Sequence, residues 1–404
     1  MHTPQRKHIK KPNAFTYGIF RILSKGISKF VFNYNITDNQ FNGTSGKRVI
    51  IANHESAIDF LMLAAAVKEK MHFVISSSFY RSLPIHNLID SVAVIPKNQF
   101  QTVFTDMRLI KEAVDSTRPL VIYPAGLMSE NGITTPIPLS TGKTLKWLDA
   151  DIYVAKISGT YLSNPKWSKI RRKGRVDLSI TKLISSEEAK QISNEKMQEM
   201  VENALYFDAY KDNDIKKVRF TNGDNIEGLE HVIYRCPSCD KEFCMDVKDK
   251  NTLVCNNCNL TLKANDLGLF EAPKDKPDYK YPSYLSALIE DKFAMEIKNN
   301  PHFEMSTTAR IHMINDKKHK FEYVGDGVVK IDRQTLLIKG MIKGEPFEKQ
   351  IFAGSFPLLP FIPGKQFEIQ ADGEIYRILP QDPKTVVKWL LAIKSLYRIH
   401  KGLL

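Results

Sequence analysis

The sequence lacks any apolar run long enough to cross a bilayer. A spanning helix needs about 20 consecutive apolar residues, and the longest run, over residues 60–67, has eight. This absence excludes a multi-pass membrane protein. The N-terminal residues also lack the apolar block and the cleavage site of a secretory signal, so we expect no export.

Cysteine is scarce, with five residues in 404, and four of the five occur in two Cys-x-x-Cys pairs. This number and spacing fit metal ligation in a reducing compartment better than a disulfide framework. Basic residues are in excess, with a net charge of +13 and an isoelectric point near 9.3. The excess indicates an anionic partner, whether nucleic acid, anionic lipid or a phosphorylated substrate.

Acidic residues are absent from the first 37 residues, which carry seven Lys or Arg. Within an N-terminal segment over residues 1–45, we expect disorder over residues 1–12 and an amphipathic helix over residues 14–31. The apolar side of this helix consists of Phe15, Ile19, Phe20, Leu23, Ile27, Phe30 and Val31, and the basic side of Arg21, Lys25 and Lys29. Such a helix either lies in a membrane interface, with its cations at the headgroups, or packs on its own domain with a solvated basic face.

Residues 46–228 alternate short apolar runs with helical patterns, which is typical of an α/β layer fold. We expect strands at residues 48–52, 72–76, 91–95, 119–123 and 151–157, and helices at residues 57–70 and 102–114. In folds of this class the active groups usually sit in loops at the carboxyl ends of strands.

Residues 229–270 form a small cysteine-bearing module. Cys236 and Cys239 are the first pair, and Cys255 and Cys258 follow after a spacer of fifteen residues. This spacing predicts a zinc ribbon in which four thiolates hold a structural zinc and leave no open position for water. The alternative is a set of thiols without metal. Acidic and basic residues nearly balance in the module, which disfavours nucleic acid as a partner.

The pattern changes after residues 271–283, a proline-rich and charged stretch that we interpret as a linker. Alternating apolar residues and turn signals over residues 284–404 predict an antiparallel β-barrel or sandwich with a C-terminal helix. The expected strands include residues 309–313, 327–332 and 335–340, and the helix covers residues 383–404. Seven or so strands capped by one helix resemble the pleckstrin-homology and GRAM-type lipid-binding fold.

One pair of residues has the spacing of a general base and its orienting carboxylate. His54 follows the strand expected at residues 48–52, and Asp59 lies five residues further on. With His54 in the turn and Asp59 at the start of the next helix, the carboxylate can accept from one imidazole nitrogen and raise the basicity of the other. The two residues also fit a capping histidine and a surface aspartate.

Three segments, taken together, resemble the motifs of the glycerolipid (lysophospholipid or 1-acylglycerol-3-phosphate) acyltransferase family. They are Asn53-His54 with Asp59 for the first motif, residues 92–97 for the second, and residues 121–126 for the third. Their order, spacing and strand contexts agree with the family, and the resemblance covers roughly residues 15–220. It implies that the α/β domain is an acyltransferase core.

The resemblance implies transfer of a fatty acyl group from a thioester donor, acyl-coenzyme A or acyl carrier protein, to a hydroxyl of a lysophospholipid or related lipid. It makes His54 the general base and Asp59 its orienter, without an acyl-enzyme intermediate, so positioning and oxyanion stabilisation supply most of the rate. The residues that it places at the substrates are Asn53, Lys97, Pro124 and Gly126.

The sequence departs from the family pattern where the acceptor binds. Ala125 stands where the third motif has its glutamate, and residues 127–129 lack the arginine that often follows the glycine. Lys97 keeps the charge of the second motif's phosphate-binding arginine but loses its bidentate geometry. Glu130 is near enough to replace the missing carboxylate. We therefore expect an acceptor whose head group differs from glycerol phosphate, and a non-catalytic lipid-binding or scaffold protein on an acyltransferase fold stays open as the alternative.

A basic loop at residues 166–175 carries six cations around Trp167. Its composition suits a phosphate, on a lipid surface or on the acyl donor, and it also suits a solvated loop. With the N-terminal helix and the C-terminal β domain, it leads us to expect a cytoplasmic protein that binds peripherally to the cytosolic face of a membrane containing anionic lipid.

Overall fold

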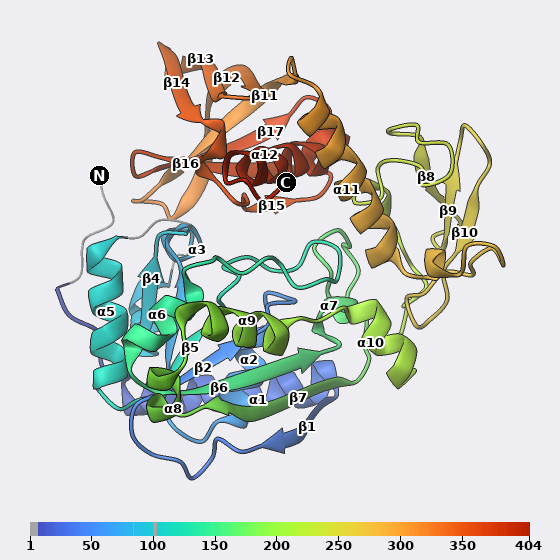
Figure 1. The fold of residues 1–404 in the computed structure, drawn as a ribbon. Helices are drawn as coiled ribbons and strands as arrows, with labels where there is room; N and C mark the ends of the chain where they lie inside the picture. Colours follow the sequence, from blue (N-terminus) through green and yellow to red (C-terminus); the bar gives the residue numbers. More distant parts are fainter. Residues whose placement is uncertain (1–6, 84, 100–102) are drawn as a thin grey trace.

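The computed structural model describes residues 7–83, 85–99 and 103–404 (Figure 1). Of the segment expected to be disordered, residues 1–6 lie outside the described residues, and residues 7–12 form no helix or strand. Among the described residues, no helix combines the length and the apolar character needed to cross a membrane.

The N-terminal half is built on a seven-stranded sheet with the order β1-β7-β6-β2-β5-β3-β4. Its strands are β1 (Tyr34–Asn39), β2 (Arg48–Ala52), β3 (His72–Ser76), β4 (Val94–Lys97), β5 (Leu120–Ile122), β6 (Asp151–Ser158) and β7 (Val176–Ile184). Neighbouring strands run parallel except β6 and β7, which are antiparallel. The sheet confirms the α/β layer fold and makes it a mixed one.

Helices cover both faces of this sheet. They are α1 (Ala14–Phe32), α2 (Asp59–Ala66), α3 (Ser77–Arg81), α4 (His86–Ser91), α5 (Phe104–Asp115), α6 (Thr141–Leu148), α7 (Thr160–Ser163), α8 (Ser186–Gln191), α9 (Asn194–Leu205) and α10 (Ala209–Lys216). The central strand β2 is buried along its whole length. Ile50 packs in one core with Tyr17 of α1, whereas Ile51 packs in a second core with Leu109 of α5. Successive side chains of β2 thus pack in cores on opposite faces of the sheet, because side chains alternate between the two faces along a strand.

Several predicted elements have different bounds in the structure. The strand expected at residues 91–95 is β4, because Ser91 ends α4 and Ala93 turns the chain with a φ of 65°. The helix expected at residues 57–70 is the shorter α2, and Val67 beyond it is already extended. The helix expected at residues 102–114 is α5, and its first expected residue lies outside the described residues.

The edge strand β1 is an element that the apolar pattern does not predict. Its residues Tyr34–Asn39 are polar and mostly exposed, yet they pair in parallel with β7. An edge strand with solvent on both sides carries no apolar alternation, so its sequence resembles a loop.

Asn13 caps the N-terminus of helix α1, and its side chain accepts from the backbone N–H groups of residues 15 and 16. It packs through Tyr17, Ser24, Ser28 and Phe32. The apolar side expected to be buried in the packed interpretation is instead largely exposed: Phe15, Ile19, Leu23, Ile27 and Phe30 reach solvent, together with Ile22. The small residues Ser24 and Ser28 permit close approach to α2, and Tyr17 and Phe32 pack in the apolar core beneath the helix.

The cysteine module (residues 229–270) contains the turn η1 (Leu229–His231) and a three-stranded antiparallel sheet, β8 (Met245–Lys248), β9 (Thr252–Cys255) and β10 (Thr261–Lys263). After it come a short turn, η2 (Pro277–Lys280), and a long helix, α11 (Pro282–Asn299). Tyr279, in the stretch interpreted as a linker, is buried, and its hydroxyl donates to the carbonyl of Pro237 over 2.9 Å. This stretch therefore packs against the cysteine module.

The C-terminal sheet domain (residues 304–400) has seven antiparallel strands in the order β14-β13-β12-β11-β17-β16-β15. The elements are β11 (Glu304–Asn315), β12 (Lys320–Asp332), β13 (Thr335–Ile342), β14 (Glu345–Phe352), η3 (Ala353–Ser355), β15 (Phe361–Ile362), β16 (Gln366–Ala371), β17 (Glu374–Pro380), η4 (Pro383–Thr385) and α12 (Val386–His400). The antiparallel sheet, its three expected strands and the C-terminal helix are confirmed. Closure into a barrel stays a prediction, since no pairing joins β14 to β15 in the described part of the chain.

The C-terminal sheet domain lies against the α/β domain, and α11 runs between it and the cysteine module (Figure 1). Arg81 of α3 forms a bidentate ion pair with Asp316, at 2.7 and 2.8 Å, and Ser78 donates to Glu368 over 2.9 Å. One apolar core contains Trp167 of the α/β domain together with residues of the cysteine module, α11 and the C-terminal sheet. The three parts therefore share buried surface.

Candidate active site and cysteine cluster

A cavity of about 2170 Å³ lies where the α/β domain meets the C-terminal sheet domain. His54, Lys97 and Tyr123, which end or follow strands β2, β4 and β5, line one wall. Helix α1 lines the cavity with apolar residues such as Leu23, and the C-terminal sheet domain lines it with residues such as Phe361. The wall at the carboxyl ends of parallel strands is the expected place for active groups in an α/β fold.

The structure brings His54 and Asp59 together. Nδ1 of His54 lies 3.0 Å from an Asp59 carboxylate oxygen, and the His54 side chain is 21% exposed whereas that of Asp59 is fully buried. Because a carboxylate accepts and does not donate, this contact favours the tautomer with the proton on Nδ1, which leaves Nε2 as the proton acceptor. No hydrogen bond of Nε2 occurs among the described residues, so the imidazole can act as a base toward the cavity that it lines.

Backbone donors hold Asp59 in place. The oxygen that contacts His54 also accepts from the N–H groups of Glu55 and Ser56, over 2.7 and 2.9 Å. Asp59 is the first residue of α2, where a negative charge is favoured by the helix dipole. Burial, and then the charge of Asp59, raise the pKa of the Glu55 carboxyl well above its usual range. Glu55 is thus the member of this acidic pair that burial favours in its neutral form.

Two further contacts position the imidazole. Tyr123 stacks on His54 with ring centroids 4.4 Å apart. The carbonyl of His54 accepts from the N–H of Ser129 over 2.8 Å, which ties the loop after β2 to the loop after β5. The third-motif segment thereby supports the first-motif histidine through Tyr123, a residue that the motif comparison did not single out.

Asn53 is placed in the sheet rather than at the cavity. Its amide donates to the carbonyl of Ile157 and accepts from the N–H of the same residue, both over 2.8 Å, and it is 1% exposed. The side chain thereby pairs with the β6 backbone at the end of β2. The structure gives Asn53 a supporting position behind His54.

Lys97, Pro124 and Gly126 line the cavity, as their expected role at the substrates requires. Burial lowers the pKa of Lys97, whose ammonium donates to the carbonyl of Asn98 over 3.0 Å. Gly126 has a φ of 71°, in the left-handed region that favours glycine. With this backbone conformation, Gly126 turns the chain after Ala125 at the cavity wall.

Glu130 is not among the described residues that line the cavity. Its carboxylate lies 3.8 Å from the ammonium of Lys394 on α12, and Lys394 also pairs with Glu290 on α11 at 2.7 Å. Sequence reasoning missed Lys394 and Glu290, because they lie more than 150 residues from Glu130 in the chain and only the packing of the domains brings the three residues together.

The basic loop does not act as one unit. Trp167 and Arg172 are buried, and the guanidinium of Arg172 lies over the Trp167 ring, 4.7 Å from its centroid. Of the six cations, Lys166 is the one found among the described cavity-lining residues. The remaining exposed cations, including Lys169, face solvent. Within this loop, Trp167 and Arg172 therefore have a structural role, and Lys166 is the cation that lines the cavity.

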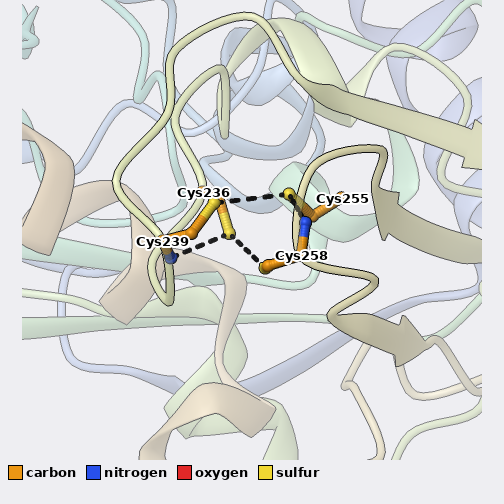
Figure 2. Close-up of side chains that lie close together, drawn as sticks. All are labelled: Cys236, Cys239, Cys255 and Cys258. Atoms are coloured by element: carbon orange, nitrogen blue, oxygen red, sulfur yellow. Dashed lines mark hydrogen bonds between the residues drawn. The ribbon is translucent and has the colours of Figure 1, made fainter.

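The four cysteines of the two Cys-x-x-Cys pairs converge (Figure 2), and their sulfur atoms all lie within 4.8 Å of one another. Cys236 lies 3.6 Å from Cys258, and Cys239 lies 3.7 Å from Cys255, sulfur to sulfur. A tetrahedral zinc with bonds of about 2.3 Å separates its sulfur ligands by about 3.8 Å. The donor set and its spacing fit a four-thiolate zinc site.

Backbone N–H groups point at two of the sulfurs. Cys236 accepts from the N–H groups of residues 238 and 239, and Cys255 from those of residues 257 and 258, all at 3.4 Å. Such donors stabilise thiolate over thiol. The fifth cysteine, Cys244, donates to the carbonyl of Lys241 over 3.0 Å and lies 3.4 Å from the sulfur of Cys255.

A family model matches the first part of the chain. It is described as Acyltransferase and matches residues 33–158. Among solved structures, the chain is similar to the 1-acyl-sn-glycerophosphate (LPA) acyltransferase PlsC from Thermotoga maritima, with 17% identity and a TM-score of 0.40. That match covers 46% of this chain and 76% of the other. No curated protein matches the sequence significantly.

The placement of Asn53 predicts a mainly structural effect for Asn53→Ala. The change leaves both the N–H and the carbonyl of Ile157 without a partner, and we expect the opening free energy of β6 to fall by about 2–4 kcal/mol. Hydrogen exchange of the β6 amides measures this loss. The control is Asn299→Ala at the exposed end of α11, which should leave these amides within about 0.5 kcal/mol of the wild-type value. Equal exchange in the two variants contradicts the structural role.

Proposed function

We propose that the protein is an O-acyltransferase that moves a fatty acyl group from a thioester to a hydroxyl of a lysophospholipid or related lipid. The observation that carries this proposal is the buried Asp59 carboxylate holding His54 at the wall of a large cavity. The match of residues 33–158 to the Acyltransferase family model supports the reaction class.

In the proposed reaction, the acceptor hydroxyl gives its proton to Nε2 of His54 while its oxygen attacks the thioester carbonyl. The new oxygen–carbon bond forms, the carbon–sulfur bond breaks, and the imidazolium returns the proton to the departing thiolate. Asp59 stabilises the imidazolium at the moment when it carries charge. The donor is a coenzyme A or acyl carrier protein thioester.

The lining of the cavity supports a lipid substrate. Its wall includes Ile19, Leu23 and Ile27 of α1 and Ile85 and Leu88 near α4. Several of these side chains are also partly exposed at the surface. An acyl chain can therefore lie against apolar side chains from the surface inward, as binding of a long chain requires.

The acceptor head group proposed here differs from glycerol phosphate. Ala125 is 3% exposed and offers no polar group, and Lys97 provides a point charge instead of a guanidinium fork. These two residues favour an acceptor that relies on other contacts for its head group.

We expect His54→Ala to reduce acyl transfer by about 10²–10⁴-fold, because the acceptor proton loses its base. The assay measures transfer of a labelled acyl group from acyl-coenzyme A to a panel of lysolipids that includes lysophosphatidic acid. His302→Ala, in an exposed turn, is the matched control and should retain wild-type activity.

Full activity of a folded His54→Ala protein ends the catalytic assignment. Lysophosphatidic acid accepting acyl groups as well as any other member of the panel contradicts the head-group expectation. Lipid binding without transfer to any acceptor favours the non-catalytic lipid-binding or scaffold protein, which the loss of the motif glutamate at Ala125 also favours.

We propose that the cysteine module is a zinc ribbon and that its metal is structural. Cys236, Cys239, Cys255 and Cys258 supply four sulfur ligands and leave no position for a reacting water. A module of this size buries little apolar surface by itself, and metal binding would supply folding energy.

Purified wild-type protein should contain one zinc per chain by elemental analysis, and so should Cys244→Ser. Cys258→Ser removes one of four ligands and should lower the zinc content to below half, while residues 229–270 become protease-sensitive. Zinc-free wild-type protein from zinc-replete medium contradicts the site. Retention of zinc by Cys258→Ser together with its loss from Cys244→Ser would show that Cys244, and not Cys258, is the fourth ligand.

We propose that α1 binds the cytosolic face of a membrane, so that the cavity lined by this helix faces the lipid. The exposed apolar residues Ile22 and Phe30 are 71% and 73% exposed, and basic residues lie on the same helix. Apolar side chains at the acyl boundary and cations at the headgroups are the arrangement of an interfacial helix.

The double variant Ile22→Asp with Phe30→Asp should reduce binding to anionic phospholipid vesicles by at least about tenfold, because two apolar side chains no longer enter the lipid. Co-sedimentation measures the effect. Ile215→Asp, which changes an exposed apolar residue of α10 (83% exposed), is the control and should bind as wild type. Unchanged sedimentation of the double variant disproves the anchoring role.

A further inference from the structure

Five charged side chains gather where the α/β domain meets the C-terminal helices, and we call them the interdomain charge cluster. Its members are Glu130 and Lys166 of the α/β domain, Glu290 of α11, and Lys394 and Arg398 of α12. Lys394 lies 2.7 Å from Glu290 and 3.8 Å from Glu130, and Arg398 lies 3.7 Å from Glu290. The proposed mechanism above uses none of the five.

The cluster has more positive than negative charge. Three cations face two carboxylates, and burial raises the pKa of Glu130, which further reduces the negative charge. Both carboxylates are engaged by Lys394. A cavity wall with this imbalance is electrostatically complementary to an anion.

Lys166 has unused hydrogen-bonding capacity. Its ammonium donates to the carbonyl of Met128 over 2.8 Å and lies 4.7 Å from the ring centroid of Phe361. An ammonium has three N–H donors, and no second acceptor for this one occurs among the described residues. Burial lowers the pKa of Lys166 to about 8, despite the opposing charge of Glu130. An anion in the cavity would supply the missing acceptors and further favour the charged form.

The cluster faces the same cavity as the candidate catalytic pair. Lys166, Lys394, Arg398 and Glu290 line the cavity along with His54. Lys166 contacts Met128, whose neighbour Ser129 donates its N–H to the carbonyl of His54. An anion at Lys166 would therefore lie in the same space as the reacting groups.

We propose that the interdomain charge cluster binds a phosphate group of a substrate, with Lys166 as the principal contact and Arg398 of the C-terminal sheet domain as the second. The identity of the substrate rests on the proposed acyltransferase function. The phosphate belongs either to the lipid acceptor or to the coenzyme A donor, and the chemistry that recognises it is the same. The C-terminal sheet domain then forms part of the substrate site.

Steady-state kinetics of the full chain test this proposal. Lys166→Met keeps the length of the side chain and removes its charge, and Lys169→Met is the matched control on the exposed part of the same loop. One arm compares an acceptor that carries a phosphate with a monoacylglycerol, at a fixed donor. The other compares acyl-coenzyme A with a phosphate-free acyl N-acetylcysteamine thioester, at a fixed acceptor.

We expect Lys166→Met to raise KM for the phosphate-bearing substrate by about 10–100-fold and for its phosphate-free counterpart by less than about twofold, with kcat nearly unchanged. Arg398→Met, a partly exposed position, should raise the same KM by a smaller factor. The arm in which KM rises identifies the acceptor or the donor as the source of the phosphate. Equal KM values for Lys166→Met and Lys169→Met in both arms overturn the proposal.

A binding measurement separates this proposal from the proposed function. Calorimetry with the His54→Ala protein measures the affinity for lysophosphatidylethanolamine, a phosphate-bearing lysolipid with another head group, and for coenzyme A without any turnover. Introducing Lys166→Met into the His54→Ala protein should weaken one of these affinities by about tenfold or more. Introducing Lys169→Met instead should weaken neither. Absence of acyl transfer with intact Lys166-dependent binding contradicts the function alone. Lys166-independent binding of both ligands contradicts the cluster alone.

Discussion

The arrangement of the candidate site depends on one carboxylate oxygen. The Asp59 oxygen that contacts His54 accepts two backbone N–H groups besides, so the turn after β2, the first residue of α2 and the imidazole are held together at one point. Because Asp59 is fully buried, these bonds form in a medium of low polarity, where they are stronger and their loss is costlier. The orientation of His54 therefore follows from the backbone of its own loop.

The second constraint is the way in which the later parts of the chain cover that loop. The C-terminal sheet domain contacts α3 through Arg81 and Ser78 and shares an apolar core with Trp167. Its strand β15 and helix α12 form a wall of the cavity. Substrate access, the polarity of the cavity and the charge near Lys166 are consequently properties of three parts packed together. The α/β domain alone does not contain them.

Much of the fold and of the candidate site follows from local patterns. The strands β2, β3 and β6 carry apolar runs, the spacing of His54 and Asp59 brings their side chains together across one turn, and the Cys-x-x-Cys pairs converge as their spacing predicts. Strand β1 was missed because an exposed edge needs no apolar alternation, and α11 because its buried residues do not stand out against the linker before it. Asn53 was expected at the substrate, yet its amide is needed to pair the backbone of Ile157.

The sequence by itself determined the local chemistry: an imidazole next to a carboxylate, four clustered thiols, and a helix with an apolar and a basic side. These features arise within short stretches of chain, where spacing and hydrogen bonding decide the geometry. Tertiary structure decided which face of α1 is exposed, that Lys166 lines the cavity while Arg172 is buried, and that Lys394 reaches Glu130. Such contacts join residues far apart in the chain, and they depend on how the domains bury surface against one another.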